Sequence, residues 1–149
     1  MRRILKAFFP AVALTYVLAS VLFTQTILAT VQSMGLDVSI GTRLHSTFAD
    51  MIGLASSYLP LIAVAFALGL PVAAGLNRWL PTQRALLYTL AGFVAIIAVH
   101  LIMKAVFGIS GLAVTRTLTG LLGQGLAGAV GGYCFHLLSR TNTQNNAVE

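Results

Sequence analysis

The fold is decided by residues 111–139, GLAVTRTLTGLLGQGLAGAVGGYCFHLLS, a stretch that is apolar and dense in glycine. Wound as an α-helix, it places its small residues on two adjacent ridges at a spacing of four residues. Glycine costs a helix in water about 1 kcal/mol relative to alanine. In lipid the backbone has no water to bond with, and glycines let a second helix approach closely. We therefore predict a membrane-spanning helix with one flat packing face, made by Gly120, Gln124, Gly128 and Gly132 on one ridge and by Gly123, Ala127 and Gly131 on the other.

The composition of the whole chain is also that of a membrane protein. The 149 residues are 58% hydrophobic and only 8% charged, whereas a soluble domain carries roughly 25% charged residues. The apolar residues form four long blocks instead of short alternating runs, which is typical of spanning helices. The net charge of +6 comes from bases that flank these blocks. We therefore expect the bases to set the membrane topology and expect no nucleic-acid partner.

The blocks predict an all-α membrane protein, a bundle of four transmembrane helices in one domain over residues 1–140. The predicted spans cover about residues 7–31, 51–76, 85–107 and 113–138. The first block is longer than the ~7–15-residue apolar core of a signal peptide, so we expect an uncleaved span. Pro60 and Pro71 predict a bend in the second span, either a static kink or a hinge. The tail at 141–149 is polar and is predicted to be disordered.

The longest polar connection lies between the first two spans. Within it, Ile40, Leu44 and Phe48 recur at helical spacing, which predicts a short amphipathic helix over residues 41–49 at the membrane surface. Thr47 and Asp50 also have the spacing of a capping box, which would instead mark the start of the second span. In either case we expect Asp50 to lie near a helix N-terminus, where a negative charge is favoured.

The distribution of bases predicts the orientation in the membrane. Cytoplasmic segments carry an excess of Lys and Arg, so we expect both termini in the cytoplasm and place the protein in the bacterial inner (plasma) membrane. Trp79, beside Arg78, is expected to anchor its turn at the membrane interface. In this orientation the inner side holds Arg2, Arg3, Lys6, Arg78, Arg84 and Arg140, and the outer side holds Arg43, Lys104 and Arg116.

Polar side chains inside the predicted spans gather in the outer leaflet. Lys104 follows His100 by four residues and shares its helix face, and Asp50 is the acid expected to pair with these bases. A central charge costs at least ~2.5 kcal/mol in lipid, so the cluster predicts an outward-opening pocket for an anionic or polar small molecule or a lipid headgroup. The alternative is ordinary interhelical hydrogen bonding with headgroup-facing bases. The candidate ligand-binding residues are Asp50, His100, Lys104, Arg116, Gln124 and Gln25.

Three functions stay open at this point. One is a non-enzymatic accessory or assembly subunit, which would pack against a second copy or another membrane protein. Another is a small transporter, channel, or lipid- or small-molecule-binding protein that uses the outer polar cluster. The third is a membrane enzyme with a His100–Asp50 acid–base couple. The accessory function would use the helix-packing glycines Gly120, Gly123, Gly128, Gly131 and Gly132.

Metal and cofactor sites are not expected. His45, His100 and His136 do not lie three or four residues apart on one helix, as the ligands of a helical metal site would. The single Cys134 excludes an internal disulfide and a cysteine metal framework. No catalytic motif with a known mechanism is present. The partner that the sequence indicates directly is the lipid bilayer.

Overall fold

The computed structural model describes residues 2–107 and 113–140 of the chain. Within these residues the chain forms α-helices and short 3₁₀ helices and no strand, which confirms the predicted all-α class. The predicted disordered tail at 141–149 lies outside the described residues. The elements are α1 (Arg2–Ser33), α2 (Ile40–Gly53), α3 (Ala55–Leu76), η1 (Pro81–Gln83), α4 (Arg84–Phe107), η2 (Ala113–Arg116) and α5 (Leu118–Arg140).

Within the described residues, four segments are long and apolar enough to cross a membrane, as predicted. Their mean hydropathy lies between 1.2 and 2.3, and the shortest have 22 residues. At 1.5 Å per residue, 22 helical residues extend ~33 Å, enough for a hydrocarbon core ~30 Å thick. The protein is therefore an integral membrane bundle, with the segments Ile4–Ser33, Ala55–Leu76, Pro81–Val106 and Leu118–Ser139 as its candidate spans.

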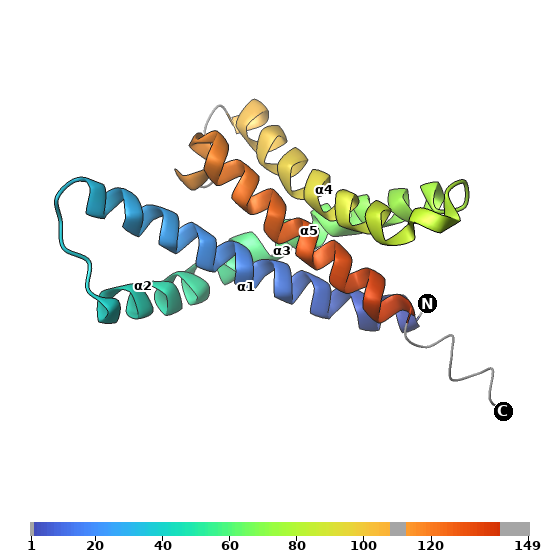
Figure 1. Ribbon diagram of the computed structural model, residues 1–149, viewed down its shortest axis with the longest axis horizontal. Helices are drawn as coiled ribbons and strands as arrows, with labels where there is room; N and C mark the ends of the chain where they lie inside the picture. Colours follow the sequence, from blue (N-terminus) through green and yellow to red (C-terminus); the bar gives the residue numbers. More distant parts are fainter. Residues whose placement is uncertain (1, 108–112, 141–149) are drawn as a thin grey trace.

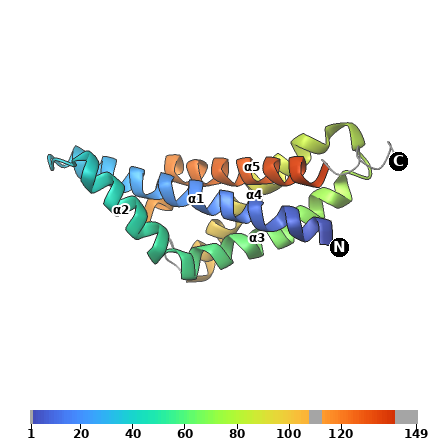
Figure 2. The same ribbon diagram turned by 90° about the horizontal axis from the view of Figure 1, so that it is seen from below.

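The two ends of the bundle differ (Figure 1). The start of α1, the turn between α3 and α4, and the end of α5 lie together at one end, which we call the termini end. The connection between α1 and α2 and the helix η2 lie toward the opposite end, the hairpin end. Helix α5 lies between α1 and α4 and makes the most extensive contacts of the fold with both. Helix α3 crosses below them in Figure 2 and packs mainly on α4.

The helix after the first span differs from the prediction in its length and its cap. Ser39 caps α2, and its Oγ accepts the Thr42 N–H at 3.1 Å. Helix α2 continues to Gly53 and ends at its cap residue Leu54. Asp50 therefore lies in the last turn of α2, so both the capping box with Thr47 and the expected place of Asp50 near a helix N-terminus are wrong. The physical reason is that Ser39 already supplies the cap, and the apolar repeat continues without interruption past residue 50.

Helix α2 turns its polar face toward the bundle. Helix α1 is 32 residues long, and its outer part projects together with α2 beyond α4 and α5 at the hairpin end (Figures 1 and 2). The face of α2 that contacts α1 is polar, whereas the opposite face is an apolar stripe. This outward apolar stripe suits contact with lipid, and the position of α2 at the membrane surface stays a prediction. The stripe consists of Ile40, Leu44, Phe48 and Ile52, all well exposed.

Glycines allow the closest helix contact of the fold, between α4 and α5. A Cβ on Gly128 would lie 2.5 Å from Ile96 Cγ1 and closer still to the carbonyl oxygen of Gly92. A Cβ on Gly132 would overlap the carbonyl oxygen of Tyr88. Real carbon atoms do not approach so closely, so only glycine fits at these positions. The backbones of α4 and α5 are therefore in direct contact, as small residues permit in membrane helices.

The second small-residue ridge of α5 packs on α1. A Cβ on Gly131 would overlap Thr15 Oγ1 and lie 3.0 Å from the carbonyl oxygen of Ala11. Gly120 is buried at the start of α5, and its N–H donates to Thr117 Oγ1 at 3.1 Å. A Cβ on Gly123, in contrast, would meet nothing within 4 Å. Gly128 and Gly132 of α5 thus contact α4, and Gly131 contacts α1.

Candidate functional site

The six predicted ligand-binding residues do not form one cluster. They come from the hairpin-end half of the bundle, but they separate into three groups with different partners. One group lines a cavity, one is a buried hydrogen-bonded amide, and one joins α1 to α2. His100, Lys104 and Arg116 line the cavity, Gln124 is the buried amide, and Gln25 and Asp50 belong to the α1–α2 contact.

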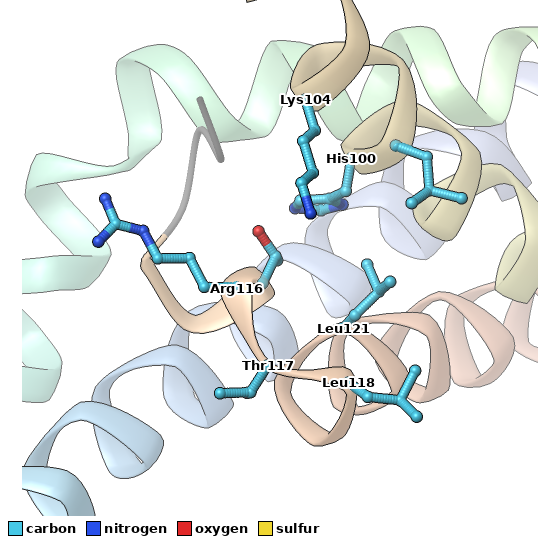
Figure 3. A pocket seen from close by; sticks show the side chains of 8 residues that line it. His100, Lys104, Arg116, Thr117, Leu118 and Leu121 are labelled. Atoms are coloured by element: carbon cyan, nitrogen blue, oxygen red, sulfur yellow. The ribbon is translucent and has the colours of Figure 1, made fainter. Parts of the chain in front are cut away.

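The cavity lies between the last turns of α4 and the start of α5 and has a volume of about 180 Å³. Figure 3 shows the side chains of His100 and Lys104 extending from α4 toward η2 and α5. The side chain of Arg116 extends away from Lys104 and forms part of the rim. None of the lining residues is acidic. They are His100, Leu101, Lys104, Thr115, Arg116, Thr117, Leu118 and Leu121.

His100 is the buried polar group of this cavity, with 4% of its surface exposed. Its Nδ1 lies 2.8 Å from the carbonyl oxygen of Ile96, and because a carbonyl only accepts, Nδ1 carries the proton and donates it. The ring meets the ring of Tyr58 edge to face at 5.7 Å between centroids. The buried Nε2 has no hydrogen-bond partner among the described residues. The neutral ring therefore offers an unused acceptor.

No acid of the described residues lies beside the bases of the cavity. Lys104 and Arg116 are both exposed. In the described part of the chain the acids are Asp37 and Asp50, and neither lines the cavity. The expected pairing of Asp50 with these bases is not found, because its carboxylate is bonded to α1 instead. The cavity is therefore lined by His100 and by two bases, with no acid among its described lining residues.

Gln124 fastens three helices together. It is completely buried, its Oε1 accepts the hydroxyl of Tyr58 at 2.8 Å, and its Nε2 donates to the carbonyl oxygen of Ala19 at 3.1 Å. These bonds join α5 to α3 and to α1. Because both ends of the amide are hydrogen-bonded within the protein, Gln124 has a structural role. It is not among the residues that line the cavity. Tyr58 was not among the predicted site residues, and the only signal for it was a hydroxyl inside an apolar block.

Helix α2 is held to α1 by a set of hydrogen bonds that we call the α1–α2 clasp. Thr24 Oγ1 lies 2.8 Å from Asp50 Oδ2. Gln25 Oε1 accepts from Arg43 Nη1 at 2.8 Å, and its Nε2 donates to Thr47 Oγ1 at 3.3 Å. Arg43 entered the sequence analysis only as a topology charge. In the fold it is the centre of this clasp.

The remaining predictions concern the packing glycines, the His100–Asp50 couple and a metal site. Gly128, Gly131 and Gly132 contact α4 or α1 of the same chain, so they offer no free face to a second protein. No interaction joins Asp50 to His100 in the described ranges, where Asp50 is instead bonded to Thr24. Residues 2–107 and 113–140 contain no group of three or more His, Cys, Asp and Glu side chains arranged to hold a metal ion.

Comparison with known proteins gives no relative from which a function could be transferred. No protein-family model, no curated protein and no solved structure matches the chain. The function must therefore be derived from the geometry of this bundle.

Proposed function

We propose that this integral membrane protein is a non-enzymatic binding protein that takes a small oxyanion, of the phosphate or carboxylate class, into the cavity between α4 and α5. The observation that carries the proposal is that His100 and Lys104 line the same cavity. His100, whose buried Nε2 has no partner among the described residues, and Lys104, one helical turn away, both line this recess, and its described lining residues include no acid. Ionisable groups inside membrane proteins are costly and are commonly functional.

The chemistry of the two side chains favours a protonated oxyanion. With Nδ1 donating to the carbonyl of Ile96, the Nε2 of neutral His100 would accept a hydrogen bond from a ligand hydroxyl. Lys104 only donates, and it would bind the charged oxygens. Hydrogen phosphate has both kinds of oxygen at neutral pH, whereas a phosphate monoester, whose second pKa is ≈ 6, is then mostly a dianion without the hydroxyl.

The size of the cavity sets the size of the ligand group. A volume of about 180 Å³ corresponds to roughly six water molecules at ~30 Å³ each. That space accommodates one tetrahedral oxyanion with a few waters. A larger molecule would have to leave its remaining part outside, past the rim formed by Arg116.

The orientation is part of the proposal. The six bases assigned to the inner side belong to the segments that meet at the termini end. The cavity lies at the other ends of α4 and α5, where α4 finishes and α5 begins. With an excess of Lys and Arg on the cytoplasmic side, the termini end faces the cytoplasm and the cavity takes its ligand from the outer side. The bacterial inner membrane is the location we propose.

The geometry favours binding over the two other functions. An accessory role through Gly128 and Gly132 would need their face to be free, and α4 occupies it. An acid–base couple of His100 and Asp50 would need the carboxylate at the cavity, and Asp50 is bonded to Thr24 in the α1–α2 clasp. The accessory function is therefore not supported by the face of Gly128 and Gly132, and the enzymatic function is not supported by a carboxylate at the cavity.

The test is the effect of inorganic phosphate on the purified, full-length protein. A ligand that binds only the folded state raises the melting temperature, and at a given concentration a tighter ligand raises it more. Phosphate is expected to raise the melting temperature more than chloride at equal ionic strength. Lys104→Gln should weaken phosphate binding by about tenfold, because it removes one charge-assisted hydrogen bond.

The matched control is Lys6→Gln, which removes the same charge from an exposed position on α1 at the termini end. It should leave the response to phosphate unchanged. Equal responses to phosphate and chloride in the unmodified protein would overturn the proposal. So would an equal loss of response in the Lys104 and Lys6 variants.

A further inference from the structure

A second and larger recess lies at the termini end, where the sequence indicated only topology charges. It has a volume of about 1000 Å³, which is the upper end of the range for ligand pockets. Its walls come from α1, α3, α4 and α5, and they are mostly apolar. The lining includes Leu5 and Phe8 of α1, Phe66 and Gly75 of α3, and Tyr88 of α4.

The length of the groove along α3 matches one leaflet of a bilayer. Phe66 and Gly75 both line it, and nine helical residues at 1.5 Å each separate them by ~14 Å along the helix axis. Half of a hydrocarbon core ~30 Å thick is ~15 Å. Leu5, near the start of α1, is more than half exposed, so the groove is open to the lipid along one side. An acyl chain can therefore enter it laterally.

Two arginines stand at the polar end of this groove. Arg78 lies in the turn after α3 and is exposed, and Arg84 begins α4. Arg84 lies with its guanidinium carbon 5.6 Å from the ring centroid of Tyr88, and its Nη2 donates to Ser139 Oγ at 2.9 Å. Its buried Nε has no partner among the described residues. A donor that is buried and unpaired is costly, and an anion at this position would satisfy it.

The positive charge of Arg78 and Arg84 at the termini end favours a negatively charged ligand. The acids in the described ranges, Asp37 and Asp50, belong to the connection after α1 and to α2, at the hairpin side. Arg78 and Arg84 therefore have no protein counter-charge in those ranges. Trp79, which is 85% exposed, adjoins them, and tryptophan prefers the headgroup level of a membrane. The basic mouth of the groove thus lies at the depth of lipid phosphates.

We infer that this groove binds one anionic glycerophospholipid, with an acyl chain along α3 and the phosphate at Arg78 and Arg84. Arginine suits phosphate because its planar guanidinium forms paired hydrogen bonds with two oxygens. The groove faces the opposite side of the membrane from the oxyanion cavity of α4 and α5. It is a separate site, and it does not depend on the function proposed for that cavity.

The experiment measures lipid binding to the delipidated full-length protein by native mass spectrometry in detergent. The probes are phosphatidylglycerol and phosphatidylcholine with identical acyl chains. The unmodified protein is expected to bind phosphatidylglycerol at least about tenfold more tightly, because only this lipid has a net negative headgroup for the arginines. Arg78→Gln, at an exposed residue, should remove most of that preference.

A second variant tests the acyl-chain part and avoids any effect on the arginines. A Cβ on Gly75 meets nothing within 4 Å, so Gly75→Leu fits the fold and places its side chain in the groove. It should weaken the binding of both lipids at this site by about tenfold. Gly123→Leu is the matched control, since a Cβ on Gly123 also meets nothing within 4 Å and Gly123 does not line the groove.

The outcomes separate the inference from its alternatives. Equal affinity for the two lipids in the unmodified protein would show a non-selective lipid contact and overturn the inference. Unchanged phosphatidylglycerol binding in both Arg78→Gln and Gly75→Leu would overturn it as well. Lys104→Gln should not alter the binding of phosphatidylglycerol, so a failure of the oxyanion cavity and a failure of this groove remain distinguishable.

Discussion

The backbone contact between α4 and α5 gives the sharpest quantitative prediction. In Gly128→Ala the new Cβ would lie 2.5 Å from Ile96 Cγ1 and closer still to the carbonyl oxygen of Gly92. Carbon–carbon contacts settle at ~3.5–4.0 Å, so the helices must separate by about 1 Å. Ile96 has a side chain that can turn, but the carbonyl of Gly92 is backbone and moves only with its helix. Forced overpacking of this kind costs about 1–3 kcal/mol.

Gly123→Ala is the matched control on the same helix. Its Cβ meets nothing within 4 Å, so only the helix propensity changes, which favours alanine by up to about 1 kcal/mol. Unfolding by a rising mole fraction of sodium dodecyl sulfate, followed by circular dichroism, gives both free energies of unfolding. Gly128→Ala should be less stable by about 1–3 kcal/mol and Gly123→Ala at least as stable as the unmodified protein. If Gly128→Ala unfolds at the same detergent fraction as the unmodified chain, the helices are not in backbone contact.

Three further predictions concern the buried network, the α1–α2 clasp and the topology. Tyr58→Phe leaves Gln124 Oε1 without its donor. It should lower the free energy of unfolding in the same assay by about 0.6 kcal/mol, the average for such bonds in membranes, and by no more than about 1.7 kcal/mol; no change would mean that the amide finds another partner. Thr24→Val removes the hydroxyl that contacts the α2 carboxylate and should increase amide hydrogen exchange in α2 but not in α5. Single cysteines introduced at Asp37 and at Thr82, with the native cysteine replaced by serine, should be labelled from outside the cell at 37 and not at 82, and the reverse result would invert the proposed orientation.

Much of the candidate site was visible in the sequence, but its partners were not. The spacing of His100 and Lys104 on one helix places them on one face in any fold, and both line the same cavity. Asp50 was assigned to the same cluster because it is an acid at a matching depth. Depth alone does not determine which helix a side chain faces, and Asp50 turned toward Thr24 of α1. Arg84 was counted as a topology charge because nothing in its neighbourhood along the chain indicates the groove that it borders.

The local pattern of apolar and polar residues determined that this chain forms helices that cross a membrane, since lipid leaves the backbone no partners except its own carbonyls. The same pattern determined the number of spans and their approximate ends. Only the tertiary structure decided which ridge of α5 meets α4 and which meets α1, and therefore which side chains share a recess. The reason is that helix pairing depends on shape complementarity between residues far apart in the chain, such as Gly92 with Gly128. The hydrophobic effect does not select the partner, because an apolar side chain has a similar free energy facing lipid or facing protein.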